Sequence, residues 1–207
     1  MNARPPRFFY FDLGNVLLFF DHEIACRQMA DVARISVDLV RAIVFEGDLQ
    51  RRYELGEIST DEFYEHFCAA SKTRPDQKRL VHAAAAIFES NAALEPIVTG
   101  LRNRGHRVGI LSNTCEAHWE YVADGRFPFV RDGFDVYALS YRMRSMKPDP
   151  AIYAQAAQMA GSAPAEIFFV DDRADNVAAG RDAGFDAVPY TDPQSLIEAL
   201  GARGIEL

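Results

Sequence analysis

The chain of 207 residues is long enough to bury the core of one sizeable domain, alone or with a smaller inserted domain. Its hydrophobic fraction of 49% and charged fraction of 25% are ordinary for globular proteins, so the composition indicates neither a disordered chain nor a membrane protein. A formal net charge of −8 argues against a nucleic-acid binder held by phosphate contacts, but it is compatible with a small anionic substrate.

The cysteines and the N-terminal region favour a soluble cytoplasmic protein. The three cysteines are odd in number and widely spaced, which indicates reduced thiols rather than a disulfide framework or a metal finger. The apolar run Phe8–Phe20 superficially resembles a secretory signal. However, Asp12 interrupts it, no small-residue cleavage site follows, and the run is too short to cross a bilayer. We therefore expect no membrane partner.

The first predicted element is a buried strand that ends in a carboxylate. Phe8–Phe11 lead directly into Asp12, and a turn follows at Leu13-Gly14-Asn15. Ligands of open α/β sheets gather outside the carboxyl ends of the strands, which makes Asp12 a candidate site residue. From this stretch alone, a carboxylate that only caps the following turn is an equally good interpretation.

Residues 22–90 carry a helical pattern. Apolar residues such as Phe63 and Phe67 recur at a spacing of three to four, which is typical of amphipathic helices. Ser59 followed by Glu62 matches a capping box, in which the two side chains satisfy the first backbone N–H groups of a helix. This segment is therefore predicted to be a small helical bundle inserted after the first strand.

The end of the inserted segment is set by its last predicted helix. Pro75 is expected to open this helix, which runs toward Ser90. Beyond it strands alternate with helices, the pattern of a largely parallel sheet covered on both faces. The predicted fold class is therefore α/β, with a Rossmann-like parallel-sheet core formed by residues 1–21 and 91–207 and a helical-bundle cap formed by residues 22–90.

The second half of the chain supplies the remaining core elements. Strands are predicted at Arg107–Leu111, Asp135–Leu139, Ile167–Val170 and Ala187–Val188. Helices are predicted at Leu94–Asn103, Pro150–Ala160, Asn176–Ala183 and Ser195–Arg203.

Three of the predicted strands end in polar residues: Asp12, then Ser112 and Asn113, then Asp171 and Asp172. Parallel strands place all of these ends at one edge of the sheet, where a site is expected. Adjacent carboxylates after a buried strand repel each other unless a cation lies near. A lysine, Lys147, precedes a proline-started helix, where its ammonium group can reach an anion.

The order of these motifs carries a family resemblance. The chain reads D-L-G-N-V at 12–16, L-S-N-T at 111–114, K-P-D-P at 147–150 and F-V-D-D-x-x-x-N at 169–176. This series resembles the four motifs of the haloacid dehalogenase-like (HAD) hydrolase superfamily, and the helical insertion resembles the cap of its first subclass. The opening motif and the cap segment Tyr53–Ser59 also resemble bacterial sugar-phosphate phosphatases that act on α-D-glucose 1-phosphate.

The resemblance implies a Mg²⁺-dependent phosphatase for a small phosphorylated metabolite, with a sugar phosphate as the expected substrate. Asp12 would be the nucleophile that forms an aspartyl-phosphate, and Lys147 would neutralise phosphoryl charge. The implied substrate-binding residues are Leu13, Gly14, Ser112, Asn113 and Lys147. The implied Mg²⁺ ligands are Asp12, the Gly14 carbonyl, Asp171 and Asp172.

The sequence departs from the family pattern at Gly14. Most phosphatases of the superfamily carry a second aspartate there as general acid and base, a role that typically contributes about 10²- to 10⁴-fold to the rate. Three explanations stay open: a phosphatase that takes the proton from water or a cap residue, a metal-independent 2-haloacid dehalogenase-type hydrolase, or a catalytically weak regulatory binding module. The paired Asp171 and Asp172 argue against the second, because carboxylates would repel a departing halide.

The cap is expected to choose the substrate, but its sequence says little about how. A polar cluster is compatible with either a pocket wall or a solvated helix face. Its members are Glu46, Arg51, Arg52, Tyr53 and Glu54. For His118 and Trp119, packing is favoured over a place in the pocket. Asn176 is expected to cap a helix or to steady the carboxylate pair. A monomer is the expected oligomeric state.

Overall fold

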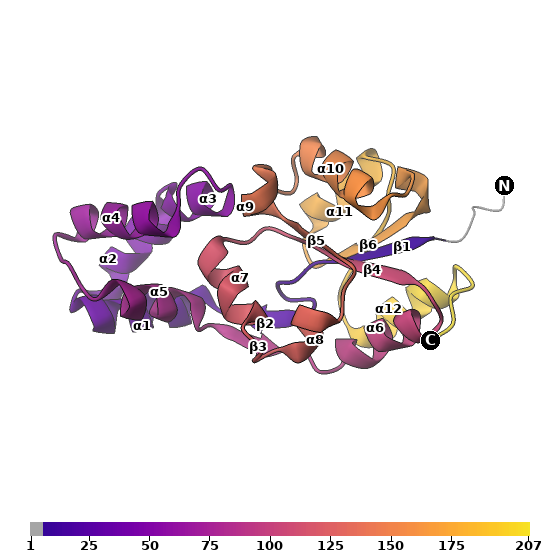
Figure 1. The fold of residues 1–207 in the computed structure, drawn as a ribbon, viewed down its shortest axis with the longest axis horizontal. Coiled ribbons are helices and arrows are strands. Elements are labelled where there is room, and N and C mark those ends of the chain that lie inside the picture. Colours follow the sequence, from indigo (N-terminus) through magenta and orange to yellow (C-terminus); the bar gives the residue numbers. More distant parts are fainter. Residues whose placement is uncertain (1–5) are drawn as a thin grey trace.

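The computed structural model describes residues 6–207, in which a sheet-based core lies beside a helical segment (Figure 1). The first five residues of the predicted core segment lie outside this description. In the described part of the chain the core holds a parallel five-stranded sheet in the order β5-β4-β1-β6-β7. Its strands are β1 (Phe8–Phe11), β4 (Arg107–Ser112), β5 (Val136–Leu139), β6 (Ile167–Asp171) and β7 (Asp186–Pro189). The predicted α/β fold class is confirmed.

Helices cover both faces of this sheet. Alternate side chains of each strand point to opposite faces, so each face carries apolar side chains that the helices bury. Phe8 and Tyr10 of β1 pack in the cluster that includes α10 (Pro150–Ala160) and α11 (Ala174–Asp182). Phe9 and Phe11 pack in the cluster on the other face, which includes α6 (Leu94–Asn103) and α12 (Pro193–Gly201). Figure 1 shows these two helix pairs on opposite sides of the strands. The short helix η2 (Pro164–Glu166) leads into β6.

Gly109 of β4 leaves room for the aromatic side chains of β1. A Cβ atom at this position would lie 2.7 Å from a ring carbon of Tyr10 and 2.8 Å from one of Phe8. The hydroxyl of Tyr10 then donates to the carbonyl of Ala156 at 2.9 Å, so the ring joins β1 to α10. A glycine inside a strand therefore marks a close approach of side chains here rather than a break.

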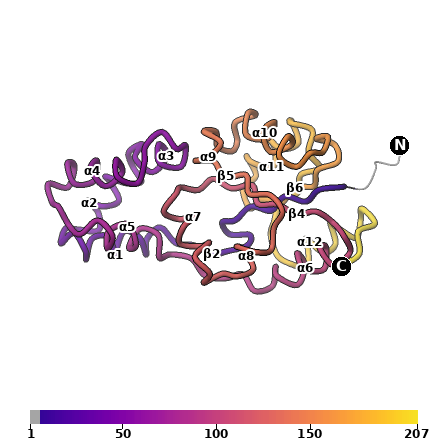
Figure 2. Tube along the Cα trace, viewed as in Figure 1, coloured from indigo at the N-terminus to yellow at the C-terminus, as the bar shows by residue number. Residues whose placement is uncertain are grey.

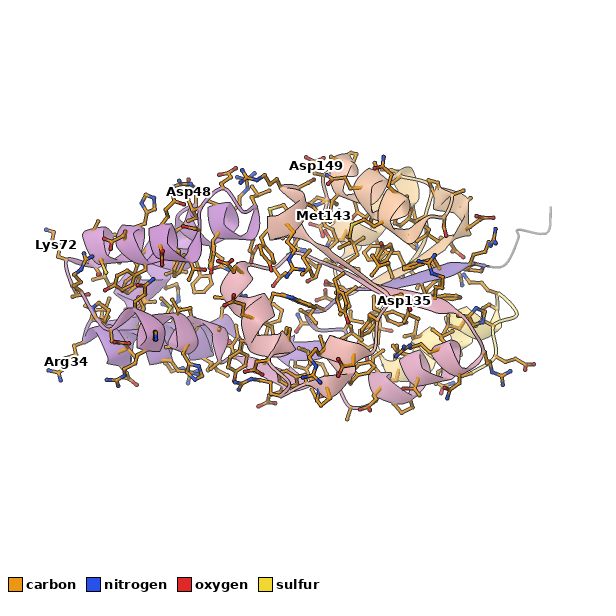
Figure 3. The ribbon with its side chains drawn as sticks, viewed as in Figure 1. Arg34, Asp48, Lys72, Asp135, Met143 and Asp149 are labelled. Carbon is orange, nitrogen blue, oxygen red and sulfur yellow. The ribbon has the colours of Figure 1, made fainter. Side chains whose placement is uncertain are left out.

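The helical segment has its own hydrophobic core, centred on Met29, Val40, Phe67 and Leu80. Its elements are α1 (His22–Ala33), α2 (Val37–Arg41), the π-helix η1 (Ala42–Glu46), α3 (Leu49–Glu54), α4 (Thr60–Ser71) and α5 (Gln77–Ala85). The capping box predicted for Ser59 and Glu62 is present at the start of α4. Figure 3 places Arg34 and Lys72, which end α1 and α4, at the end of the segment away from the sheet.

The helix predicted from Pro75 to Ser90 is wrong at both ends. Asp76 caps α5 by accepting from the Arg79 backbone N–H, so the helix begins after the proline. Residues 88–90 form the strand β3 (Phe88–Ser90), which pairs antiparallel with β2 (Leu18–Phe20). The tube in Figure 2 shows the chain entering the helical segment after β2 and returning through α5. Pairing between β2 and β3 thus overrides the local helical pattern. The boundary between cap and core at residue 90 stays a prediction.

The other predicted elements are present, with ends shifted by a few residues. Besides η2, three short helices of the core were not predicted: α7 (Glu116–Ala123), α8 (Pro128–Asp132) and α9 (Ser140–Met143). They span only 8, 5 and 4 residues, which is too short for a clear helical spacing of apolar residues. Among residues 6–207, no helix combines the length and the apolar composition that a membrane crossing requires.

We expect Ile110→Ala to lower the free energy of unfolding by about 2–5 kcal/mol, because it removes a fully buried side chain of β4. The same change at Ile197, which is 39% exposed on α12, is a matched control expected to cost less than about 0.5 kcal/mol. Urea unfolding of both variants measures the difference. Equal losses would contradict the placement of Ile110 in the core.

Candidate active site

The register of the central strands brings the predicted site residues to one sheet edge. Phe11 of β1 lies opposite Ile110 of β4 and Val170 of β6, so the residues that follow each strand emerge at the same level. The backbone N–H of Asp12 continues the pairing by donating to the Val170 carbonyl at 2.9 Å. In Figure 1 this edge faces the helical segment.

Three carboxylates meet at this edge. One oxygen each from Asp12, Asp171 and Asp172 lies within 4.8 Å of the others. Asp171 is fully buried and Asp12 is 7% exposed, whereas Asp172 is partly exposed. Carboxylates this close repel one another, and hard oxygen ligands suit Mg²⁺. The donor set therefore fits a hard divalent cation.

Lys147 places a positive charge beside two of these carboxylates, Asp12 and Asp171. Its Nζ atom lies 2.8 Å from Asp12 Oδ1 and 2.5 Å from Asp171 Oδ2, and it donates to the Leu111 carbonyl at 2.8 Å. Only 2% of the residue is exposed. The ammonium group is thus fixed between the first and fourth motifs, where we had expected it to face an anion.

Burial and neighbouring charges act together on the pKa values of Asp12 and Lys147. Burial raises the pKa of Asp12 to about 7, with Asp171 and Asp172 adding to the rise and Lys147 opposing it. Burial would lower the pKa of Lys147, but the carboxylates of Asp12 and Asp171 outweigh it and raise that pKa overall. Because the local charge is negative even with Lys147 in place, an added cation would favour ionised Asp12.

Asn113 holds the backbone of Lys147 through two hydrogen bonds. Its Nδ2 donates to the Lys147 carbonyl at 2.8 Å, and the Lys147 N–H donates to its Oδ1 at 2.7 Å. The Ser112 hydroxyl, which is buried beside the pocket, donates to the Asn113 carbonyl at 3.3 Å. Asn113 therefore positions the lysine, a role that the sequence did not suggest.

Two more asparagines orient the fourth-motif carboxylates. Asn176 Nδ2 lies 3.0 and 3.1 Å from the two oxygens of Asp171, so it steadies that carboxylate as one of the sequence interpretations expected. Asn15 Nδ2 donates to Asp172 Oδ2 at 3.1 Å. Asn15 was not among the site residues predicted from the sequence. Its backbone is left-handed (φ 54°), a conformation that asparagine tolerates well.

The turn after Asp12 is shaped by Gly14 and Phe20. A Cβ atom at Gly14 would lie 2.6 Å from Phe20 Cε1, so the aromatic ring occupies the space beside the glycine. The Leu13 N–H donates to Asp12 Oδ1 at 2.7 Å and fixes the orientation of that carboxylate. An aspartate at position 14 would require Phe20 to move.

A pocket of about 620 Å³ opens in front of these groups. The strand ends form its floor, Phe20 and Phe88 of the β2-β3 ribbon line one part of it, and α3 contributes Arg51 and Glu54. His118 also lines it although it is buried, with Nε2 3.3 Å from the Ala84 carbonyl.

Only part of the polar cap cluster faces the pocket. Arg52 lies 3.8 Å from Glu57, and Glu46 is exposed and does not line the pocket. The Tyr53 hydroxyl is turned toward the core instead, where it accepts from the Ala117 N–H at 3.0 Å. Trp119 packs into the core, as favoured from the sequence.

Comparison with known proteins places this geometry in context. A family model described as haloacid dehalogenase-like hydrolase matches residues 7–184. D-ribitol-5-phosphate phosphatase of Bacteroides thetaiotaomicron is 26% identical over 185 residues, which cover 85% of this chain and 87% of the relative.

Two solved structures have the same fold. A HAD family enzyme of Bacteroides thetaiotaomicron, in complex with magnesium and inorganic phosphate, has a TM-score of 0.81 and 25% identity over 90% of this chain and 94% of its own. A HAD-like family hydrolase of Porphyromonas gingivalis has a TM-score of 0.83 and 24% identity over 98% of this chain and 99% of its own. With the family model spanning all four motifs and the motif residues gathered at one pocket, the chain belongs to the haloacid dehalogenase-like hydrolase family and is a hydrolytic enzyme.

Proposed function

We propose that this enzyme is a Mg²⁺-dependent phosphatase that hydrolyses a small phosphorylated metabolite through an aspartyl-phosphate on Asp12. The observation that carries this proposal is the cluster of Asp12, Asp171 and Asp172 around the buried Lys147 ammonium group, on the floor of a pocket. Such a site combines a nucleophile with the positive charge that phosphoryl transfer requires.

Asp12 is suited to attack the phosphorus atom. A carboxylate oxygen forms the new bond to phosphorus while the bond to the leaving-group oxygen breaks, and water then releases phosphate and regenerates the carboxylate. The contacts from the Leu13 N–H and Lys147 to Oδ1 fix the carboxylate orientation, which leaves Oδ2 as the freer oxygen for attack.

Mg²⁺ would be held by Asp12, Asp171, Asp172 and the Gly14 carbonyl. It supplies positive charge that allows an anionic nucleophile to approach an anionic phosphoryl group. The residues that we propose for the phosphoryl oxygens are Lys147, Ser112, Asn113 and the backbone N–H groups of Leu13 and Gly14. The Leu13 N–H, which donates to Asp12 Oδ1 in this structure, would exchange that contact for one to the substrate. Asn113 in addition keeps Lys147 in place through its two hydrogen bonds.

The proton for the leaving group comes from water or from the cap in this proposal. Phe20 takes up the space beside Gly14 where most family phosphatases carry their second aspartate.

The other two sequence hypotheses receive less support. A metal-independent dehalogenase has no use for three carboxylates within 4.8 Å, since they would repel a leaving halide. A regulatory binding module does not require a buried lysine paired with the candidate nucleophile, a costly arrangement that catalysis explains.

The proposed substrate class is a sugar or polyol phosphate. The curated relative named for D-ribitol 5-phosphate supports this class. Hydrolysis of α-D-glucose 1-phosphate stays a prediction from the sequence resemblance. We further propose a cytoplasmic location, which is supported by the buried free thiols at Cys26, Cys68 and Cys115. A monomer stays a prediction.

Asp12→Asn is expected to lower kcat for aryl phosphate hydrolysis by more than about 10³-fold, because a neutral amide cannot serve as the nucleophile. Asp76→Asn is a matched control at an exposed N-cap, where asparagine caps equally well. Steady-state kinetics and thermal melts of both variants test this. An active Asp12→Asn enzyme would refute the covalent mechanism.

Mg²⁺ is expected to raise the unfolding free energy of the wild type, by about 2.7 kcal/mol at 100 times its Kd. Asp172→Asn should weaken Mg²⁺ binding by at least about 10-fold, the loss that follows even when a supporting residue is removed. Thermal melts titrated with MgCl₂, against NaCl at equal ionic strength, measure both effects. The same Mg²⁺ dependence in wild type and variant would contradict the ligand assignment.

A further inference from the structure

The β2-β3 ribbon gives the pocket a wall of aromatic rings. Phe20 of β2 and Phe88 of β3 pair across the ribbon, with their ring centroids 6.1 Å apart. The His22 ring lies 5.0 Å from that of Phe20, and the His118 ring lies 5.4 Å from that of Phe88, measured between centroids. All four residues line the pocket, and Phe20, His22 and Phe88 are only partly buried, so part of each ring is accessible. We call these four residues the aromatic wall.

The aromatic wall is uncharged at neutral pH. Burial lowers the pKa of His118 to about 4, and burial also lowers the pKa of His22. The Ala84 carbonyl lies 3.3 Å from His118 Nε2, where a neutral imidazole can donate to it and fix the ring. A molecule in the pocket therefore meets an apolar surface on this side, with no ionised group in it.

The aromatic wall begins beside the residues proposed for Mg²⁺ and the phosphoryl group. A Cβ atom at Gly14 would lie 2.6 Å from Phe20 Cε1, so the Phe20 ring adjoins the backbone of Gly14. In-line attack by Asp12 places the leaving-group oxygen on the far side of the phosphorus atom, away from the strand end and inside the pocket. The leaving group is therefore the part of the substrate that reaches the aromatic wall.

Charged groups of the helical segment line the pocket on a different side. Among the pocket-lining residues of segment 22–90, the charged ones are Arg51 and Glu54, and both belong to α3. In Figure 1, α3 lies above the strand ends and the β2-β3 ribbon lies below them. A leaving group between these two sides meets an apolar surface on one and polar groups on the other. We therefore expect it to have one apolar face and hydroxyl groups elsewhere.

A closed-ring sugar has this distribution of groups. The C–H bonds of its ring form a largely apolar face, whereas its hydroxyl groups point outward from the ring edge. An open-chain polyol carries a hydroxyl group on every carbon and rotates about each C–C bond, so it presents no continuous apolar face and loses more conformational freedom on binding. Burial of about 55 Å² of apolar surface corresponds to about 10-fold in affinity, so one ring face against the wall is enough to discriminate between the two.

We propose that the aromatic wall selects the leaving group, and that the preferred substrate is the phosphate ester of a closed-ring sugar rather than of an open-chain polyol. This inference rests on the proposed phosphatase function and narrows its substrate class. It assigns the selection to Phe20 and Phe88 of the ribbon, with His22 and His118 extending the same surface.

The test compares substrates that differ mainly in ring closure. D-glucose 6-phosphate is paired with D-glucitol 6-phosphate, and D-ribose 5-phosphate is paired with D-ribitol 5-phosphate. Acetyl phosphate, which has a small leaving group without a ring, is the reference for phosphoryl transfer. With Mg²⁺ present, the wild type is expected to show a kcat/KM about 10-fold higher for the closed-ring member of at least one pair.

Phe88→Ala removes one ring of the wall. It is expected to lower the ratio of kcat/KM for the closed-ring substrate to kcat/KM for acetyl phosphate by about 3- to 10-fold, and Phe88→Leu, which keeps an apolar side chain, should lower it less. Phe19→Ala is the matched control, because Phe19 precedes Phe20 on β2 but is 47% exposed and does not line the pocket, so the ratio should not change. Thermal melts show whether each variant folds, and the comparison in the wild type needs no variant.

The outcomes separate this inference from the function on which it rests. A wild type that hydrolyses none of these compounds in the presence of Mg²⁺ would overturn the phosphatase proposal itself. A wild type that hydrolyses acetyl phosphate but prefers the closed-ring member of neither pair would overturn only the selection by the aromatic wall. A folded Phe88→Ala enzyme with an unchanged ratio would also overturn it, since the leaving group would then not contact the wall.

Discussion

The ion pairs of Lys147 with Asp12 and Asp171 are the interaction on which the rest of the site depends. They join the third motif to the first and fourth motifs inside a region that is almost closed to solvent. Breaking such a buried set by removing one partner typically costs about 3–5 kcal/mol, because it leaves an uncompensated charge. Much of the surrounding structure serves this cluster: Asn113 holds the lysine backbone, Asn176 steadies Asp171 and Asn15 orients Asp172. The cluster still carries excess negative charge, which is what makes it receptive to a divalent cation.

The helical segment completes the pocket through contacts that also attach it to the core. The Tyr53 hydroxyl accepts from the Ala117 N–H, and the Glu54 carbonyl lies within hydrogen-bond distance of Ser140. Gly56 allows the closest approach, because a Cβ atom there would lie 2.1 Å from the Tyr141 carbonyl oxygen. The end of α3 therefore lies close to α9, and Glu54, the last residue of α3, lines the pocket. The end of α3 therefore both attaches the helical segment to the core and lines the pocket.

The fold and the chemistry-bearing residues could be predicted from the sequence to different extents. Strands that end in Asp12, Ser112 and Asp171 were recognisable because buried apolar runs stop at polar residues, and parallel pairing then brings their ends together. The β2-β3 ribbon was missed, since three-residue strands carry too little pattern and Phe88 is fixed by its tertiary partner Phe20. The roles of Asn113 and Asn15 depend on contacts between distant segments, which no local pattern encodes.

The central claim is that Asp12 becomes phosphorylated during turnover. The most direct measurement is an acid quench of the enzyme during hydrolysis of p-nitrophenyl phosphate with Mg²⁺, followed by borohydride reduction and peptide mass spectrometry. Reduction converts an aspartyl-phosphate to homoserine, and the account predicts homoserine at position 12 only when substrate is present. Turnover with position 12 unmodified, or with the modification at Asp171 or Asp172, would contradict it.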